Sequence, residues 1–308
     1  MKLKYYFTKV KIEEIDLENR DFLFSYPKRN KFLKESIQKF GVLEPPILIS
    51  TSEKFKIVSG EGRILALKDL QQTIVPVIIV ENLSPAECLL ISLETNLFRP
   101  LNLIEKADFI DKALKYLSIE EVIKLLPKLN FSSNYIWINF LQKINKLEDK
   151  FKIFIIENKL NPKLAEKLSE LKKEEKEEFW EIFQKLRLTF SEQKEVLEML
   201  IDLKKFYELP TLVPEKLKKI LDESDFNKRR KKFFEKLYEM KFPFYSKKRK
   251  KISDLINNFK KRGIELRFSP YLEKRDIELK LKLTSPEDFK KLNELLKIHE
   301  KEILEVFE

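Results

Sequence analysis

Cysteine and histidine are almost absent from this 308-residue chain, which contains one of each. The single cysteine, Cys88, excludes an internal disulfide and a cysteine-based zinc cluster. The single histidine, His299, excludes multi-histidine metal sites and disfavours catalysis by a Ser-His or Cys-His pair. Several common classes of enzyme are therefore disfavoured. Cys88 is followed by Leu-Leu-Ile and is expected to be a small buried apolar residue.

Long apolar runs are also missing, so no segment is expected to span a bilayer. The N-terminal lysines alternate with aromatic and aliphatic residues, a pattern unlike that of a secretory signal peptide. Because 43% of the residues are hydrophobic, we expect a globular protein with two or three domains. These observations predict a cytoplasmic protein with no membrane partner.

The net charge of +11 is concentrated in one segment. Between Lys228 and Arg262, 15 lysines and arginines stand against three acidic residues, so the rest of the chain carries a charge of −1. Such a segment is typical of a surface that faces a polyanion, with nucleic acid as the usual partner and a membrane surface as the alternative. A solvated lysine-rich face without a partner is the third interpretation. The candidates for contacts with DNA phosphates are Lys228, Arg229, Arg230, Lys247, Lys248 and Arg249.

Residues 1–100 are predicted to form a mixed α/β domain. Ile12 and Ile15 suggest a short first strand, and the first helix is expected to end at Gly41. Hydrophobic periodicity predicts the following elements in order: helix Lys31–Phe40, strands Ile47–Ser50 and Phe55–Val58, helix Ile64–Leu70, strand Val75–Val80 and helix Pro85–Leu97.

Residues 101–209 are predicted to be all-helical and to contain a helix-turn-helix. A capping box, Ser118 with Glu121, begins the first helix, Glu120–Leu126, and Asn134–Leu141 would be the recognition helix. Ser191 is expected to cap a later helix, Glu192–Phe206. A helical hairpin without a DNA role is the alternative interpretation.

The exposed side of the recognition helix follows from its predicted apolar face, Ile136, Phe140 and Ile144. Tyr135 and Trp137 are expected to belong to the core rather than to stack on bases. Hydroxyl and amide side chains bind phosphates and base edges. The candidate DNA contacts here are Ser132, Ser133, Asn134, Asn139 and Lys143.

The C-terminal part is divided into a basic linker or helix, residues 210–246, and a small αββα domain, residues 247–308. In its second strand Ile277, Leu279, Leu281 and Leu283 alternate with charged residues, so one face is expected to be buried. Ser285 is expected to cap the last helix. So small a unit buries little surface alone, which predicts a homodimer formed through this domain.

Two of the four glycines lie in Ser59-Gly60-Glu61-Gly62-Arg63, between a predicted strand and a helix. This turn would present free amides at a helix N-terminus, where phosphate binds readily, and Arg63 could add charged hydrogen bonds. A tight structural turn with a surface arginine explains the same residues. The segment is neither a Walker loop nor a dinucleotide fingerprint.

A second polar constellation lies between two predicted helices, from Glu94 to Glu105. Asn96 and Arg99 could bind phosphate or a metal-bound water, and Glu94 and Glu105 are the candidate carboxylate ligands of Mg²⁺, together with Asn96. A helix-end turn in which Asn102 caps the next helix is the alternative.

These motifs together resemble the ParB family of chromosome and plasmid partition proteins. Ile57-Val58-Ser59-Gly60-Glu61-Gly62-Arg63-Ile64-Leu65-Ala66 is similar to its VAGERRxRA box. Asn96-Leu97-Phe98-Arg99 matches most of its ENxxR box, and Leu101-Asn102 with Ile104-Glu105 and Ala107 follows as LNxIExA does. The order of the boxes holds from about residue 10 to residue 170. The end of the chain is similar to the family's dimerisation unit.

The resemblance implies a ParB- or sulfiredoxin-like N-terminal fold and an α+β protein overall. It implies a CTP–Mg²⁺ site formed by Gly60, Glu61, Gly62, Arg63, Asn96 and Arg99. It also implies double-stranded DNA as a partner, a nucleoid-associated location, and a CTP-gated clamp on DNA. The reactive cysteine of sulfiredoxin is replaced here by Glu61, so that enzyme is not expected.

Three departures from the family pattern bear on activity. Gly62 replaces an arginine, and Thr95 replaces the glutamate implicated in hydrolysis, so at most a weak CTPase is expected. A ParA-type ATPase is a possible partner, but no N-terminal tail of the kind that engages it precedes the domain. The alternatives are a ParB-fold transcriptional regulator without nucleotide switching, a ParB-like nuclease, and a scaffold that does not bind DNA.

Overall fold

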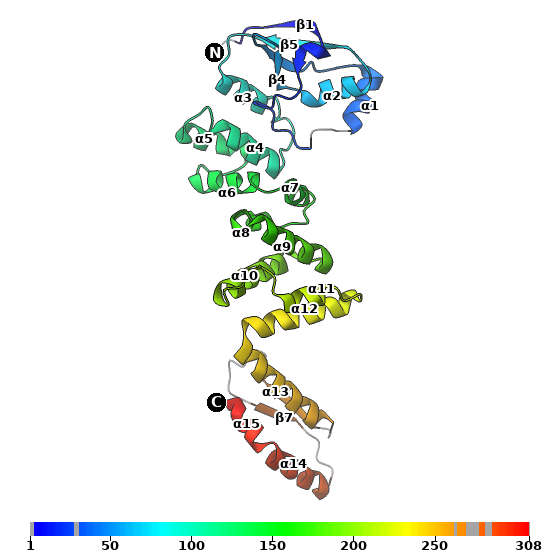
Figure 1. Ribbon diagram of the computed structural model, residues 1–308, viewed down its shortest axis with the longest axis vertical. Helices are drawn as coiled ribbons and strands as arrows, with labels where there is room; N and C mark the ends of the chain where they lie inside the picture. Colours follow the sequence, from blue (N-terminus) through cyan, green and yellow to red (C-terminus); the bar gives the residue numbers. More distant parts are fainter. Residues whose placement is uncertain (1–2, 28–30, 262–263, 269–276, 281–284, 308) are drawn as a thin grey trace. The chain divides into compact units, whose positions relative to one another are not determined.

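The computed structural model describes residues 3–27, 31–261, 264–268, 277–280 and 285–307 (Figure 1). The chain divides into two compact units, Met1–Lys172 and Lys173–Glu308, called unit 1 and unit 2 below. Sheet and helices are both present in each unit, which confirms the predicted α+β class. Among the described helices, none has the length and apolar character needed to cross a membrane.

Unit 1 opens with a sheet that has the strand order β1-β5-β3-β4-β2 in the described residues. β1 pairs antiparallel with β5, and β3 pairs parallel with β5 and antiparallel with β4, while β2 runs parallel to β4. The strands are β1 (Tyr5–Lys11), β2 (Ile15–Asp16), β3 (Ile47–Ser50), β4 (Phe55–Ser59) and β5 (Ile74–Val80).

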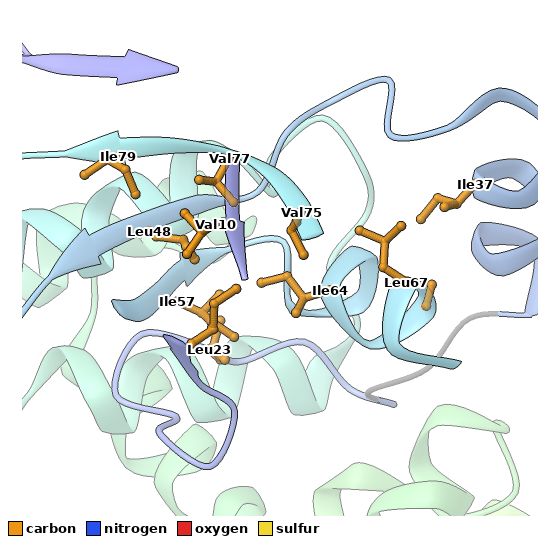
Figure 2. Packing of buried hydrophobic residues seen from close by; sticks show 12 residues of the cluster. Val10, Leu23, Ile37, Leu48, Ile57, Ile64, Leu67, Val75, Val77 and Ile79 are labelled. Carbon is orange, nitrogen blue, oxygen red and sulfur yellow. The ribbon is translucent and has the colours of Figure 1, made fainter. Parts of the chain in front are cut away.

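The core of this domain lies between the sheet and two helices, α1 (Lys31–Phe40) and α2 (Glu61–Asp69) (Figure 2). Alternate residues of β5 are buried, as a half-buried strand requires. Burying each such side chain contributes roughly 1.5–3 kcal/mol. The buried side chains include Ile37, Leu48, Ile57, Ile64, Leu67, Val75, Val77 and Ile79.

The predicted position of the first strand is wrong. Strand β1 lies earlier, at Tyr5–Lys11, while Ile12–Glu14 forms a 3₁₀ turn and Ile15 belongs to the two-residue β2. β1 is an edge strand in which only Val10 is buried, so it shows no alternation that sequence analysis could detect. The other elements predicted in this domain are confirmed to within three residues, including α3 (Pro85–Glu94).

The rest of unit 1 is helical. Ser118 and Glu121 form the predicted capping box at the start of α5, and that helix ends before Pro127, as expected. Asn134 caps α6 through a hydrogen bond from the amide of Ile136 to its Oδ1, at 2.9 Å. The elements are α4 (Leu103–Ala113), α5 (Ile119–Leu125), η2 (Leu126–Leu129), α6 (Tyr135–Asn145), α7 (Asp149–Ile156), η3 (Pro162–Leu164) and α8 (Ala165–Glu170).

Unit 2 begins with four helices, α9 (Lys173–Leu186), α10 (Phe190–Phe206), α11 (Glu215–Leu221) and α12 (Phe226–Lys241). The cap predicted for α10 is wrong, because Thr189 rather than Ser191 accepts the helix amide and closes a capping box with Glu192. Both residues carry a hydroxyl, so only the backbone geometry distinguishes them.

The start of the segment expected to be a basic linker or helix is packed within unit 2. Leu212 and Val213 are fully buried, and the amide of Val213 donates to Glu178 at 3.0 Å. The predicted domain boundaries at residues 100, 209 and 246 stay predictions.

The chain ends with α13 (Pro243–Lys260), β6 (Glu265–Phe268), β7 (Ile277–Lys280), α14 (Pro286–Ile298) and α15 (Glu300–Phe307). Helix α14 begins with the predicted Ser285 cap, and α15 was not expected. Leu279 is 38% exposed, whereas the alternation predicted a buried face. Leu281 and Leu283, predicted on the same face, lie outside the described residues.

Candidate functional site

The loop between β4 and α2 is shaped by Gly60. Its φ of +95° is a left-handed conformation that side chains disfavour, and a Cβ there would lie 2.7 Å from the Cβ of Pro46. No side chain caps α2, so the first amides of this helix remain available to a ligand. The predicted glycine turn therefore exists, and it leaves a helix N-terminus open.

A cavity of about 740 Å³ lies next to this loop and contains both predicted motifs. Gly60, Glu61, Gly62 and Arg63 form one part of its wall, and Asn96, Arg99 and Asn102 form another. The segment Leu23–Pro27 forms a further part of the wall. Six of the residues predicted to bind nucleotide are therefore brought together, although they come from two motifs separated by more than thirty residues.

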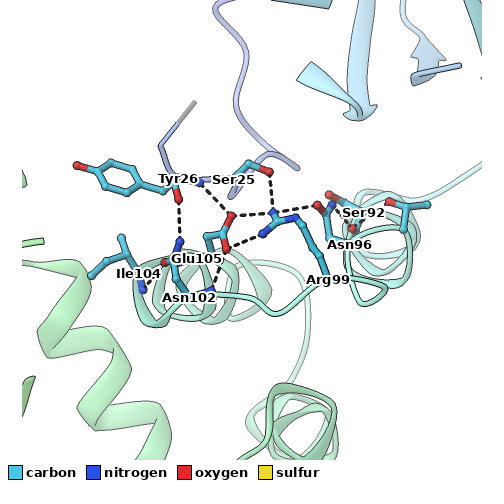
Figure 3. A network of polar contacts seen from close by, with 9 residues as sticks. Ser25, Tyr26, Ser92, Asn96, Arg99, Asn102, Ile104 and Glu105 are labelled. Carbon is cyan, nitrogen blue, oxygen red and sulfur yellow. Dashed lines mark hydrogen bonds and ion pairs between the residues drawn. The ribbon is translucent and has the colours of Figure 1, made fainter. Parts of the chain in front are cut away.

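Arg99 and Glu105 are the centre of a polar network beside the cavity (Figure 3). Arg99 donates from Nη1 and Nη2 to the two oxygens of Glu105, at 2.8 and 2.7 Å, and from Nη2 to Oδ1 of Asn96 at 3.1 Å. The amides of Tyr26 and Asn102 also donate to Glu105, at 3.2 and 3.0 Å. The network therefore fixes the guanidinium at the cavity wall, where its side chain is 33% exposed.

Glu105 has no capacity left for a metal ion. A carboxylate offers about four lone-pair sites, and the four donors just described occupy them. Its side chain is only 3% exposed. Asn102 takes part as well, because its Oδ1 caps α4 and its Nδ2 donates to the carbonyl of Tyr26 at 2.7 Å. Glu105 is thus a structural partner of Arg99, and the capping role weighed for Asn102 is confirmed.

Glu61 is buried at the other side of the cavity. Its Oε1 accepts from Nη1 of Arg20 at 2.5 Å, whereas its Oε2 is buried without a hydrogen-bond partner among the described residues. A buried carboxylate oxygen without a partner is costly, so it marks a place where a ligand or a water can bind. Arg63 forms an ion pair with Glu44, whose side chain is 71% exposed.

Glu94, predicted as a metal ligand, does not line this cavity. It forms an ion pair with Lys128 of η2 instead, and both side chains are about half exposed. Thr95, in the position where the ParB motif has glutamate, places its Oγ1 2.7 Å from Oγ of Ser59. No group of three or more potential metal-binding side chains is found among the described residues.

The motifs alone did not identify Arg20, Glu44, Ser25 and Tyr26 as parts of this site. Arg20 and Glu61 are 41 residues apart, and no spacing in the sequence connects them. Cys88 is buried as predicted. Burial raises the pKa of its thiol to about 11, with a contribution from Glu87, so the group is neutral at physiological pH.

The candidate DNA contacts on α6 are only partly available. Asn134 and Ser132 are used within the turn, since Asn134 caps the helix and Ser132 accepts from Nε1 of Trp137 at 2.9 Å. Lys143 forms an ion pair with Glu166. The side chains of Ser133 and Asn139 are exposed.

The predicted buried face of α6 is wrong. The residues that pack are Ile138, Leu141 and Ile144, whereas Ile136 is 68% exposed. Tyr135, expected in the core, is 52% exposed. The two possible faces share Ile144 and contain equally apolar residues, so the sequence could not decide between them.

The basic residues of α12 are also used unequally. Lys228 is exposed, but Arg229 donates to the carbonyl of Glu223 at 2.9 Å. Arg230 donates to the carbonyl of Leu186 at 2.8 Å and forms an ion pair with Glu192. Lys247, Lys248 and Arg249 belong to α13, and their side chains lie outside the described residues.

Comparison with known proteins identifies the sheet domain. Residues 6–97 match the family model of the ParB N-terminal domain. They form a ParB N-terminal domain. The family predicted from the motifs is therefore confirmed for this part of the chain.

Relatives of the ParB N-terminal domain include a nucleoid occlusion protein of Lysinibacillus sphaericus (strain C3-41). It is 37% identical over 94 residues, a match that covers 30% of this chain and 30% of that protein. The chain thus matches less than a third of the length of this relative.

Solved structures with ParB N-terminal domains are also similar. A truncated ParB of Caulobacter crescentus complexed with CTP-γ-S is 20% identical over 54% of this chain and 93% of its own, with a TM-score of 0.26. The same protein complexed to the centromeric parS site is 16% identical over 61% and 97%, with a TM-score of 0.33. A Pnob8-like ParB-N domain is 16% identical over 77% and 99%, with a TM-score of 0.38. These scores are low, so the assignment rests on residues 6–97.

Proposed function

We propose that this chain is a DNA-binding protein of chromosome or plasmid partition or of nucleoid organisation, and that its N-terminal domain binds CTP with Mg²⁺. The observation that carries the nucleotide part is the cavity of about 740 Å³ whose walls contain both motif segments. Its volume lies in the range usual for small-molecule sites. CTP is the nucleotide that the ParB resemblance implies.

The residues around the cavity suit a triphosphate. The uncapped N-terminus of α2 offers amides and a partial positive charge, and Gly62 adds no side chain to the cavity wall. Arg99 retains donors that Glu105 does not use, and it is already oriented. Arg63 can exchange its exposed partner Glu44 for a phosphate at small cost.

The three glutamates that line the cavity are each paired with an arginine, Glu44 with Arg63, Glu61 with Arg20 and Glu105 with Arg99. A bound Mg²⁺ would offset the charge of the phosphates. The unpartnered Oε2 of Glu61 and the cavity-lining Asn96 are the groups that would hold the ion or its waters. Glu94 and Glu105 are not proposed as ligands, because Glu94 lies outside the cavity wall and Glu105 already accepts four hydrogen bonds.

We expect turnover of the nucleotide to be slow. Thr95 cannot act as a carboxylate, and its hydroxyl already lies within hydrogen-bonding distance of Ser59. Binding, rather than hydrolysis, is therefore the proposed role of the cavity.

The nucleotide proposal is tested by titrating the full chain with CTP, ATP and GTP, with and without Mg²⁺. CTP should bind selectively, and Arg63→Ala should weaken it about tenfold, the usual effect of losing a charged hydrogen bond. Arg187→Ala, an arginine of unit 2 that packs over Phe226, is the matched control and should bind normally. If the folded protein binds DNA but no nucleotide, the nucleotide proposal is wrong and a ParB-fold transcriptional regulator without nucleotide switching is favoured.

The DNA part is tested by measuring duplex affinity against salt concentration. Each phosphate contact should contribute about 0.9 to the slope of log affinity against log salt, so Lys228→Ala should reduce the slope by about that amount. Lys68→Ala, an exposed lysine on α2, should leave the slope unchanged. Salt-independent failure to bind any duplex would favour a scaffold. Degradation of supercoiled DNA in the presence of Mg²⁺ would favour the alternative function, a ParB-like nuclease.

We further propose that the chain forms a homodimer through its C-terminal part. Leu279, Phe289, Ile298 and Leu304 are all more than a third exposed in the single chain, around a small core. Sedimentation should show a dimer, and Leu279→Glu should shift it to the monomer. The neighbouring change Glu278→Ala should have no effect.

A further inference from the structure

Helix α6 presents a mixed outward face. Buried Ile138, Leu141 and Ile144 hold the helix against unit 1 on one side. On the opposite side Ile136, Asn139 and Lys143 follow one another at helical spacing. An exposed isoleucine, an exposed amide and a lysine therefore form a single stripe along α6. Tyr135 lies beside its beginning.

The isoleucine stands at the start of the helix, where base contacts are usually made. Ile136 is the second residue of α6 and the most exposed apolar side chain on it, at 68%. The polar neighbours Ser132 and Asn134 are engaged in the turn, so they leave Ile136 as the most prominent side chain at this end. In helix-turn-helix proteins the N-terminal residues of the second helix contact base edges.

The segment that carries this stripe has no acidic residue of its own to oppose DNA. Residues 127–146 contain no aspartate or glutamate, in a chain that has 51 of them. Of their three lysines, Lys128 and Lys143 form ion pairs with glutamates from other segments, and Lys146 is exposed. Nothing in this stretch therefore repels a phosphate backbone that approaches α6. Amide and hydroxyl groups at Asn139 and Ser133 match the hydrogen-bonding edges of bases.

We propose that Ile136 determines DNA specificity by packing against the C5-methyl group of a thymine in the major groove, next to a base pair contacted by Asn139. This inference rests on the proposed DNA-binding function and adds the base that α6 recognises. Thymine alone among the four bases presents a methyl group in the major groove, and apolar side chains select it by contact. Asparagine pairs with adenine edges, so the contacted step should contain A·T pairs.

The test begins with the full chain and a pool of random duplexes, from which bound sequences are enriched. In the enriched site, each thymine is then replaced singly by deoxyuridine, which removes the methyl and keeps every hydrogen bond. At one position in each half-site, affinity should fall about fourfold, the effect expected for one buried methyl group. Replacements elsewhere in the site should change affinity less than about twofold.

The inference also requires that truncation of Ile136 removes the sensitivity of binding to the thymine methyl group. Ile136→Ala should weaken binding to the thymine site about tenfold. It should bind the deoxyuridine site no worse than the thymine site, because the contact is already lost. Ile119→Ala, which truncates an isoleucine 45% exposed on α5, is the matched control and should bind as the wild type does.

The outcomes separate the inference from the function beneath it. Failure to enrich any sequence would overturn both. An enriched site that tolerates deoxyuridine at every position would overturn the inference alone. Equal losses for Ile136→Ala on both duplexes would do the same, because they would show that Ile136 contacts something other than the methyl.

Discussion

Arg99 in unit 1 and Arg230 in unit 2 are held in almost the same way. Each pairs with a glutamate that also closes a capping box, Glu105 with Asn102 at α4 and Glu192 with Thr189 at α10. A capping glutamate is fixed by two backbone or hydroxyl donors, so it orients the arginine bound to it. The two pairs are therefore similar, although Arg99 contacts both oxygens of Glu105 and Arg230 contacts one oxygen of Glu192.

Their surroundings differ. Arg99 lies on the wall of the large cavity, and part of its guanidinium remains accessible. Arg230 donates to the last turn of α9 and packs over the ring of Phe234, 5.3 Å from its centroid. It is not among the residues that line the cavity beside Arg99. An arginine–glutamate pair thus organises packing in both units, and the pair in unit 1 also lies on the wall of a cavity.

The largest expected effect comes from removing Glu105. Glu105→Ala removes the carboxylate partner of Arg99 and leaves the amides of Tyr26 and Asn102 without their acceptor, so the free energy of unfolding should fall by about 3 kcal/mol or more. The control is Glu94→Ala, an exposed pair that should cost less than about 1 kcal/mol. Urea unfolding measures both. Similar losses for the two variants would show that Glu105 is not the centre of the network.

Substitution of Gly60 tests whether close packing at this glycine is needed for the shape of the cavity loop. Gly60→Ala should reduce stability by about 3 kcal/mol, because the positive φ and the clash with Pro46 both oppose a Cβ. At Gly41 the φ is +74° but nothing lies within 4 Å, so Gly41→Ala should cost only about 1 kcal/mol. Nucleotide binding should be lost in the first variant and kept in the second. Equal effects would mean that backbone strain alone, without close packing, determines the loop.

The sequence predicted the ParB domain well because its signals are local. Strands with a buried alternating face, capping boxes such as Ser118 with Glu121, and a glycine between strand and helix can all be recognised within ten residues. Edge strand β1 was misplaced because its residues are exposed on both sides. The same locality explains why the motif residues could be found, whereas their assembly into one cavity comes from the tertiary fold.

The partners of those residues were not predictable. Arg20 reaches Glu61 across 41 residues, and Arg230 reaches Glu192 across 38, so both pairs depend on tertiary packing. The sequence marked Arg99 and Arg230 equally as anion contacts, and only the cavity distinguishes them. The buried face of α6 was wrong for a related reason, since which apolar stripe packs is decided by neighbouring helices.

Arg230 gives a smaller and pH-dependent effect. Burial opposes ionisation of Glu192, but Arg230 and Thr189 outweigh it and lower the pKa of the carboxyl below its ordinary 4.5. A lowered pKa contributes stability above pH 4.5 that is lost as the pH falls through the value in the folded protein. Arg230→Ala should therefore be less stable by about 2 kcal/mol at pH 7, and the difference should shrink in acid.

Two further measurements sharpen this result. Lys231→Ala, whose partner Glu235 is 4.0 Å away on an exposed helix face, should change stability by less than about 0.5 kcal/mol at any pH. In conditions where it stays folded, Arg230→Ala should retain the salt dependence of DNA binding. A smaller slope of log affinity against log salt would show that Arg230 contacts DNA phosphates. Both arginines would then bind an anion, and the contrast with Arg99 would no longer hold.

A smaller effect than that of Arg230→Ala is expected from the helix cap that includes Glu192. Thr189→Ala removes the hydroxyl that accepts from the amide of Glu192 and should reduce stability by about 1 kcal/mol, whereas Ser191→Ala should be nearly neutral. Because Glu192 serves both the cap and Arg230, losses from Thr189→Ala and Arg230→Ala should not add, with a coupling of about 0.5 kcal/mol or more. Strict additivity would mean that Glu192 holds Arg230 without help from the cap. The two arginines would then resemble each other in pairing with a glutamate, but the helix cap would not be what orients the glutamate at Arg230.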